Sequence, residues 1–438
     1  MKKKILFTDR GYATRYVKSE KFEGYYVALS VDNKKDLQVL GLNVIACFEE
    51  EFDALAEAEV TYPYLKYSFQ TDRFLNGRFN HEERIRILRK EKSFWSRVLD
   101  DLKPDLIVNE VCTTEFFEVL CIEAQKRNIR YESFLFGFVP GKFYWLSTPF
   151  NSELDEEAWS KAIINEKTIE DADHYIEEIK GKQYLPWNIK NISHNIIRSV
   201  FGSLHAVVKA YIDRWRNRSH FYYEDYVQQR IYSFRISWSR LFHHCDKKST
   251  VLGKEYVFFP LHFVPEASIN YFSEFFYDQV SIIENISRCL KENQYLVVKE
   301  HPAQVGLLST KDYRRVKNKC SNIIYISGAE SSMDIACGAK CIVTITGTVG
   351  YEGLIIGKPV ISMGNVFYNH NQDVMHINSY KELKEIIRED KLVYPNENRT
   401  LNFVREFIGI QVNGVPYLNT KVTQKGIDDF TQSIETKL

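Results

Sequence analysis

The sequence predicts an α/β protein with two domains, each built on a parallel β-sheet and joined by a helical connector. Its 438 residues are too many for one ordinary hydrophobic core. Short apolar runs alternate with longer amphipathic segments, most regularly between 251 and 380. Hydrophobic residues at 44% and charged residues at 26% are typical of a globular protein.

The first domain is expected over residues 1–185. Apolar runs predict buried strands at 3–8 and 105–109, and helical spacing predicts helices at 81–102 and 114–127. Strands that alternate with helices form parallel sheets, so we interpret this region as Rossmann-like.

Residues 186–250 differ in character and are expected to form the helical connector. They hold 11 Lys and Arg against 4 Asp and Glu, interleaved with 12 aromatic residues. The group includes Arg214, Trp215, Arg216, Arg218, Tyr222, Tyr223, Arg235 and Trp238. Such a helix can rest on an anionic membrane surface. It can equally be a connector whose rings pack inward and whose arginines are solvated.

The second domain is expected over 251–380, followed by a charged helical tail at 381–438. Strands are predicted at 256–260, 295–299, 323–326, 341–345 and 359–363. Helices are predicted between them at 270–290, 310–319, 330–337 and 349–356. This alternation indicates a doubly wound sheet.

Charge and cysteine usage exclude several classes of protein. Lys and Arg total 58, as do Asp and Glu, so bulk charge does not favour a nucleic-acid partner. The 8 cysteines form no C-x-x-C pair, which indicates reduced thiols. We find no signal-peptide core and no apolar stretch long enough to span a bilayer. A cytoplasmic location is therefore expected, with contact at the inner face of the membrane left open.

Ligands of open α/β sheets bind beyond the carboxyl ends of the strands, and three polar clusters fall at such ends. The first is 299–302, where alternation along the strand places Lys299 and His301 on one side, as a phosphate site requires. The second, 260–266, is a loop with two prolines that carries His262 and Glu266. Either cluster can also be an ordinary surface turn.

The third cluster is the glycine-rich turn 346–353. Gly347 and Gly350 open a predicted helix, whose first N–H groups favour an anion. The hydroxyls of Thr346 and Thr348 can cap this helix or bind phosphate. Glu352, one turn further, can accept hydrogen bonds from ribose hydroxyls. A plain strand-to-helix turn is the alternative.

These ordered motifs resemble the capsule polysaccharide biosynthesis family, which includes bacterial β-Kdo transferases (Kdo is 3-deoxy-D-manno-octulosonic acid). The resemblance covers about 250–370 and includes Gly-Lys-Pro-Val at 357–360. It is looser in the first half, where 104–110, Glu115 and 137–143 are similar to the segment that faces the acceptor.

The resemblance implies a GT-B fold, in which two Rossmann-like domains face each other across a cleft. Lys299 and His301 would hold the donor phosphate with support from the turn at Thr346–Thr348, and Glu352 would contact the ribose. His262, Glu266 and Lys142 are further candidates for substrate binding. Glu110 and Glu115 are the candidates for nucleophile or acid–base catalyst.

The implied activity is transfer of a sugar, with CMP-Kdo as the favoured donor, to a glycan or glycolipid acceptor of capsule or lipopolysaccharide. In this interpretation side chains and a helix terminus neutralise the donor phosphate, so we expect no metal and no other cofactor. Two alternatives stay open: a non-hydrolysing nucleotide-sugar 2-epimerase, and a non-catalytic glycan-binding component of a capsule assembly or export complex.

Overall fold

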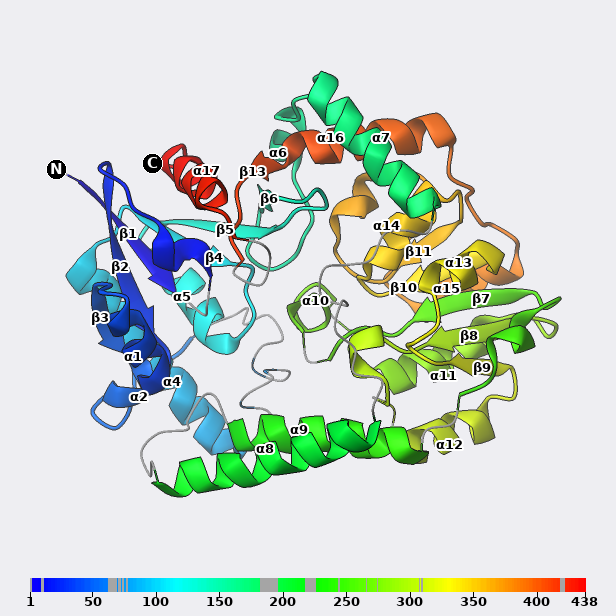
Figure 1. Cartoon of the computed structure of the whole chain (residues 1–438), viewed down its shortest axis with the longest axis horizontal. Helices are drawn as coiled ribbons and strands as arrows, with labels where there is room; N and C mark the ends of the chain where they lie inside the picture. The colour runs from blue at the N-terminus through cyan, green and yellow to red at the C-terminus, as the bar shows by residue number, and fades with distance from the viewer. Residues whose placement is uncertain are drawn as a thin grey trace. The chain divides into compact units, whose positions relative to one another are not determined.

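The computed structural model describes the chain except residues 1, 9–11, 62–68, 70–71, 73–74, 76–77, 182–195, 217–225, 243–244, 265, 274, 307, 309 and 418–421. The described chain forms two compact units (Figure 1). Unit 1 contains Met1–Thr168 and Glu406–Leu438. Unit 2 contains Ile169–Arg216 and Tyr226–Arg405.

Unit 1 is built on a seven-stranded sheet in the order β13-β6-β5-β4-β1-β2-β3. The strands are β1 (Lys3–Thr8), β2 (Phe22–Ala28), β3 (Val44–Cys47), β4 (Leu106–Glu110), β5 (Arg130–Phe136), β6 (Lys142–Trp145) and β13 (Val412–Asn413). β1 to β5 run parallel, β6 runs antiparallel to β5, and β13 pairs antiparallel with β6. The parallel part therefore has the Rossmann order 3-2-1-4-5.

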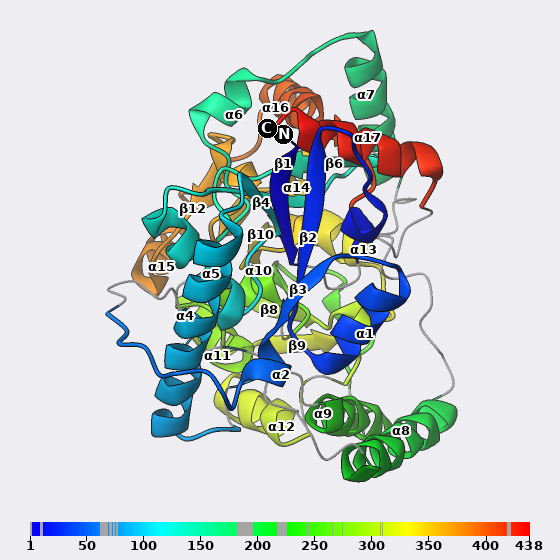
Figure 2. The same cartoon turned by 90° about the vertical axis from the view of Figure 1, so that its left-hand side faces the viewer.

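Helices cover both faces of this sheet. Figure 2 shows α4 (His81–Leu102) and α5 (Glu115–Lys126) on one side of β1–β3 and α1 (Val31–Val39) on the other. α17 (Gln424–Glu435) packs with α1 in the core on that second face. α4 begins at His81 because Asn80 and Glu83 cap its first turn reciprocally.

Unit 2 is built on a six-stranded parallel sheet in the order β12-β11-β10-β7-β8-β9. The strands are β7 (Tyr256–Pro260), β8 (Tyr295–Lys299), β9 (Ile323–Ile326), β10 (Cys341–Thr344), β11 (Val360–Ser362) and β12 (Val374–His376). Counted along the chain this is 3-2-1-4-5-6, the order of a dinucleotide-binding sheet. The strands are buried on both faces, so they are almost continuously apolar.

Two helical layers enclose this second sheet (Figure 1). One core lies under α11 (Gln279–Cys289), α12 (Thr310–Lys319) and α15 (Tyr380–Arg388). The other lies under α13 (Ser332–Gly338), next to α14 (Thr348–Ile355). α10 (Ala267–Asn270) is a single turn in the loop after β7.

Six further helices complete the described part of the chain. α2 (Phe48–Glu51) follows β3, and the others are α6 (Glu156–Ser160), α7 (Glu166–Lys180), α8 (Ile196–Arg216), α9 (Tyr226–Ser239) and α16 (Glu397–Ile410). Among the described residues no helix has both the length and the apolar character needed to cross a bilayer.

The predicted α/β class and its two Rossmann-like sheets are confirmed. The chain passes between the units within α7 and within α16, so the boundaries of the units differ from those of the predicted domains. Residues 169–180 group with unit 2, and the tail from 406 returns to unit 1 because β13 adds to its sheet. The cleft expected between two such domains stays a prediction.

One predicted helix is shorter than expected. The segment 270–290 contains a turn after α10, and α11 begins only at Gln279, because the Asp278 side chain caps it there. The strands β2, β3, β5, β6, β12 and β13 were not expected from the sequence. Most are short or partly exposed, so their apolar runs are interrupted.

Replacing Trp95 with Ala should destabilise unit 1 by about 3–5 kcal/mol, the range for a large core ring. Trp95 is fully buried on α4, its ring centroid lies 4.7 Å from that of Phe116, and its Nε1 donates to the Phe116 carbonyl at 2.8 Å. Urea unfolding measures the change. Val39→Ala, at a position 86% exposed on α1, is the matched control and should shift stability by less than about 0.5 kcal/mol.

Candidate functional site

The strand order of unit 2 reverses between β7 and β10. These neighbouring strands send their connections in opposite directions, and in such sheets ligands bind at this switch point, beyond the carboxyl ends of the strands. The loop after β7 carries His262, and the loop after β10 carries the glycine-rich turn. Two of the three clusters singled out in the sequence therefore flank one switch point.

His262 joins these two loops. Its Nε2 accepts a hydrogen bond from the Thr346 N–H at 3.0 Å and lies 3.3 Å from Thr344 Oγ1. Burial, followed by the nearby His301, lowers the pKa of His262 to about 3, so the ring is neutral at physiological pH. Gln279, at the start of α11, holds the His262 backbone through both its N–H (2.7 Å) and its C=O (3.1 Å). His262 therefore positions the turn and offers no charge to a ligand.

The turn after β10 depends on glycine for close packing. A Cβ on Gly347 would lie 2.9 Å from Thr344 Oγ1 and 3.1 Å from His262 Nε2. A Cβ on Gly350 would lie 2.8 Å from the Tyr368 hydroxyl. Gly347 is also the N-cap of α14 and makes no side-chain cap hydrogen bond, because glycine has no side chain. The first N–H groups of α14 consequently face the end of the sheet, where an anion is stabilised.

Two polar side chains accompany this helix terminus. Thr346 is nearly buried, and its Oγ1 has no hydrogen-bond partner among the described residues. Glu352 is also buried, and burial raises the pKa of its carboxyl to about 7, partly opposed by a hydrogen bond with Thr348. A carboxyl with a pKa near 7 is half ionised at neutral pH, so hydrogen bonds from hydroxyl groups readily shift it toward the ionised form.

Lys299 ends β8 beside β7, where it pairs with Pro260. It is 1% exposed, and its Nζ donates to the carbonyls of Glu300 at 3.1 Å and Gly328 at 3.2 Å. Burial lowers the pKa of Lys299 to about 8, although the carboxylates of Glu300 and Glu330 oppose this shift. An ammonium has three donors, so these two carbonyls leave one for a phosphate.

Glu300 supports the loops around Lys299. Its carboxylate accepts from the Gly306 N–H at 2.7 Å, the Tyr325 hydroxyl at 3.2 Å and the Gly328 N–H at 3.3 Å. No role was expected for this residue from the sequence. Its position between Lys299 and His301 is the signal that could have identified it.

His301 lies against the loop after β7. Its ring meets that of Phe263 edge-on, with centroids 5.6 Å apart, and its Nδ1 accepts from the Ala303 N–H at 3.2 Å. Burial and the Lys299 charge lower the pKa of His301 to about 4. Gln304 ties the same two loops, since its Oε1 accepts from the Val264 N–H at 2.7 Å.

The structure thus brings Lys299, His301 and the turn 346–352 to one edge of the sheet, with His262 as the link. Glu266 stands apart from this network: it is exposed, and its carboxylate accepts from the Ser268 hydroxyl at 2.9 Å.

Unit 1 has a comparable switch point, between β1 and β4. Glu110 ends β4 and is partly exposed, and the Tyr12 hydroxyl donates to its Oε2. The Tyr417 hydroxyl hydrogen-bonds the same carboxylate, and burial together with Glu110 raises the pKa of Tyr417. Sequence reasoning missed both tyrosines, because Tyr417 arrives from the far end of the chain and pairs there with Tyr12.

Glu115 has a different environment at the start of α5. It is fully buried, its carboxylate pairs with Arg84 at 2.8 Å, and its N–H donates to Asp72 Oδ2 at 3.0 Å. Burial raises the pKa of Glu115, while the Arg84 charge opposes this effect. Its contacts resemble those of a structural ion pair more than those of a group that meets substrate.

Lys142 begins β6, which runs antiparallel to β5. Its position therefore lies toward the same sheet edge as Glu110, two strands away. Its backbone C=O accepts from the Gly137 N–H at 2.9 Å.

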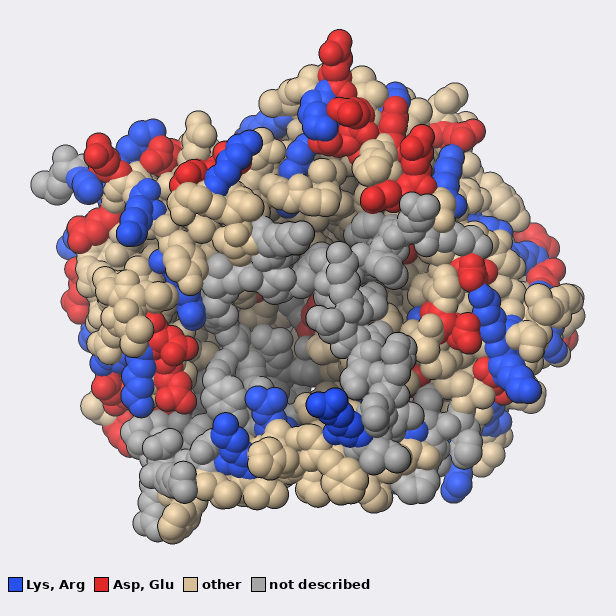
Figure 3. Space-filling view, in the orientation of Figure 1, with Lys and Arg blue, Asp and Glu red and all other residues tan. Residues whose placement is uncertain are grey.

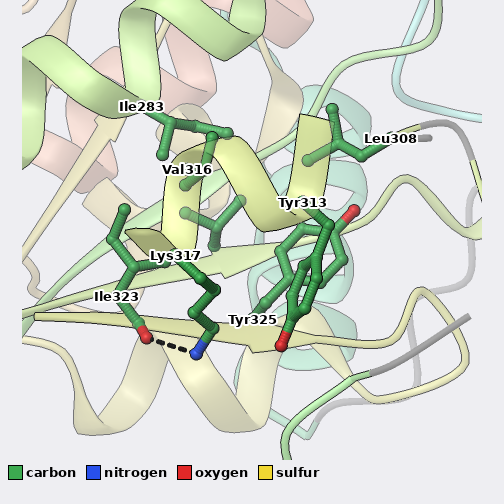
Figure 4. Close-up of a pocket in the computed structure, with 8 residues that line it drawn as sticks. Ile283, Leu308, Tyr313, Val316, Lys317, Ile323 and Tyr325 are labelled. Carbon is green, nitrogen blue, oxygen red and sulfur yellow. Dashed lines mark hydrogen bonds between the residues drawn. The ribbon is translucent and has the colours of Figure 1, made fainter. Parts of the chain in front are cut away.

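A small recess also lies under α12, on the α11 side of the second sheet (Figure 4). Ile283, Val298, Leu308, Val316 and Ile323 make it apolar, and its Lys317 already donates to the Ile323 carbonyl at 2.7 Å. Since Val298 and Lys299 point to opposite faces, this recess is separate from the candidate site. Across the described part of the chain, no group of three or more His, Cys, Asp or Glu side chains is placed to hold a metal ion.

Two Rossmann-like sheets with polar groups at their switch points define an α/β protein of the class in which ligands bind beyond the strand ends. The model of the family described as "Capsule polysaccharide biosynthesis protein" matches residues 187–375. This match confirms the resemblance that the motifs predicted, and it extends that resemblance back into the connector.

Among curated proteins, Protein FixF of Sinorhizobium fredii is 26% identical to this chain over an alignment of 153 residues. The alignment covers 32% of this chain and 36% of that protein, so it spans about a third of the relative it matches.

Two solved structures illustrate the structural similarity. The "beta Kdo 2,7 transferase" KpsC of Thermosulfurimonas dismutans is 12% identical with a TM-score of 0.36, over 94% of this chain and 99% of that one. The UDP-GlcNAc 2-epimerase of Neisseria meningitidis is 11% identical with a TM-score of 0.30, over the whole of both chains.

Glu115→Ala should destabilise unit 1 by about 3–5 kcal/mol, because it leaves the buried Arg84 charge unpaired. The double variant Arg84→Met, Glu115→Leu should recover much of this loss, since it removes both charges. Urea unfolding of the variants gives the comparison. If Glu115→Ala retains wild-type stability, the pair has no structural role.

Proposed function

We propose that the protein is a glycosyltransferase that moves a sugar from a nucleotide donor to a bacterial surface polysaccharide, with the donor bound by unit 2. One observation supports this more than any other. His262 anchors the turn 346–350 at the β7–β10 switch point, so that the start of α14 lies at the same edge of the sheet as the Lys299–His301 strand end, with β7 between them.

In this proposal the α14 N-terminus and the Thr346 hydroxyl receive the donor phosphate. His301 and the remaining Lys299 donor add positive charge, since an anion favours the protonated form of each. These groups neutralise the phosphate without a metal ion. Glu352 accepts hydrogen bonds from the ribose.

We propose CMP-Kdo as the first donor to test, on the basis of the family's motifs. The acceptor is then a growing capsule or lipopolysaccharide glycan. We place the protein in the cytoplasm, where nucleotide sugars are made.

Of the two glutamates, we favour Glu110 as the group that meets the substrate. A catalytic carboxylate has to reach the anomeric carbon or the acceptor hydroxyl, and Glu110 is partly exposed whereas Glu115 is sealed in its ion pair. Tyr12 and Tyr417 orient the Glu110 carboxylate. Lys142 and Glu266 are proposed as acceptor contacts.

A thermal-shift panel of CMP, UDP, GDP and their sugars tests the donor site. The proposal expects one nucleotide to raise the melting temperature, since a ligand at 100 times its Kd stabilises the folded state by about 2.7 kcal/mol. Interconversion of a UDP-sugar without acceptor would instead identify an epimerase. Binding without turnover on any glycan would identify a non-catalytic protein.

The affinity for that nucleotide should increase as the pH rises from 5.5 to about 7.5. Ribose hydroxyls donate to the ionised form of Glu352, whose pKa in the free protein is about 7, so binding releases a proton. In the free protein this window lies above the pKa of His301, about 4, and below that of Lys299, about 8. A proton that the bound anion adds to His301 would oppose the trend, so the Glu352 contribution is read from the comparison with a Glu352 variant. Calorimetric titrations across this pH range measure the change.

Glu352→Gln is the matched control for this pH dependence. Titration of the ligand phosphate is common to both proteins, so only the Glu352 contribution should disappear in the variant. An identical pH profile in the variant would remove Glu352 from the site.

Glu110→Gln should abolish sugar transfer, a loss of at least about a thousandfold, while nucleotide binding stays unchanged. The substitution preserves shape and removes the charge. A transfer assay with labelled donor gives the rate, and calorimetry gives the affinity. Full activity in Glu110→Gln would show that another group acts as the catalytic carboxylate.

A further inference from the structure

α8 in the connector presents an exposed apolar stripe. Six large hydrophobic side chains on this 21-residue helix are between 42% and 70% exposed: Phe201, Leu204, Val208, Tyr211, Ile212 and Trp215. Isolated exposed hydrophobic residues are ordinary, but a contiguous row along one helix marks an interaction surface.

The spacing of these residues places them on one face. At about 100° per residue they fall within an arc of roughly 100°, which runs the length of a helix about 30 Å long. Arg198, His205 and Lys209 follow along one border of the same arc, and all three are exposed. This pattern, an apolar face bordered by cations, is typical of helices that lie flat in a lipid interface.

α9 packs against α8 and, like α8, exposes basic and apolar side chains. The two helices lie side by side (Figure 1), with the hydroxyls of Ser199 and Ser237 3.2 Å apart. α9 contains no acidic residue, exposes Arg230 and Arg235, and ends beside the exposed Trp238 and Leu241. Figure 3 shows Lys and Arg side chains along α8 and α9 on the face that it draws.

We propose that the α8–α9 hairpin docks the protein on an anionic lipid bilayer, with the α8 stripe inserted at the level of the headgroups. Charge complementarity favours this partner. Each Lys or Arg near an anionic surface adds to binding, whereas a second copy of the chain would bring the same cations face to face. Unlike a membrane span, such a surface helix needs only one apolar face.

The hairpin is connected directly to the candidate donor site. The Tyr232 hydroxyl on α9 donates to the Val264 carbonyl at 3.0 Å, in the loop that follows His262. Arg240, just after α9, donates to the Val305 carbonyl at 2.7 Å, in the loop that follows His301. If the proposed function holds, this connection keeps the donor loops near the membrane, where a lipid-linked acceptor is found.

Sedimentation of the full-length protein with vesicles tests the proposal. We expect binding to phosphatidylcholine vesicles that contain phosphatidylglycerol and little binding to phosphatidylcholine alone. The double variant Phe201→Ser, Trp215→Ser should bind at least about tenfold more weakly. Arg198→Gln with Lys209→Gln should also weaken binding and reduce its dependence on salt.

Leu252→Ser is the matched control, since Leu252 is 77% exposed but lies outside the hairpin. It should bind vesicles like the wild type, and all variants should keep the wild-type melting temperature. The assay needs neither nucleotide nor acceptor, so its result is independent of whether the protein transfers a sugar.

Two results would overturn the proposal. One is equal vesicle binding by the wild type and the Phe201→Ser, Trp215→Ser variant. The other is a wild-type dimer in light scattering that becomes a monomer in this variant without any vesicle binding, which would show that a second copy covers the stripe.

Discussion

The hydrogen bond from the Thr346 N–H to a buried, neutral His262 is the interaction on which the site in unit 2 depends. A protonated imidazole has no acceptor nitrogen, so burial has to keep the ring neutral for this bond to form. The bond fixes the position of the turn after β10 relative to the loop after β7, and Gln279 fixes the His262 backbone in turn. The open end of α14 is thereby held at the sheet edge without a side-chain cap.

The strand end at β8 shows how one short motif supplies both a binding surface and its support. Lys299 and His301 are the candidate phosphate contacts, while Glu300 organises Gly306, Tyr325 and Gly328 around them. Burial depresses the pKa values of Lys299 and His301, so the site is less positive when empty than its residue types suggest. An arriving anion would favour protonation of both groups.

The connector links the candidate donor site to the proposed membrane-binding surface. Tyr232 on α9 and Arg240 just after it hydrogen-bond the two loops that carry the donor-site residues, and α8 carries the exposed apolar row. A helix pair attached in this way orients the site loops relative to whatever surface it rests on. The sequence left two interpretations of this segment open, and the exposed fractions of Phe201 and Trp215 show that these two rings do not pack inward. The predicted aromatic residues Tyr222 and Tyr223, with Arg218, lie outside the described residues.

The sequence by itself determined the α/β class, the long buried strands and the motif positions, because apolar periodicity and glycine-rich turns are local properties of the chain. It also placed Lys299, His301 and Thr346 at strand ends, and Glu352 one turn into the helix that follows. Only the tertiary structure decided which of these side chains meet, since strand order brings β10 beside β7 across about 80 residues of sequence. The same holds for Glu110 and Glu115, which look alike in sequence. Burial and distant partners separate them, because Arg84 neutralises one while Tyr12 and Tyr417 orient the other.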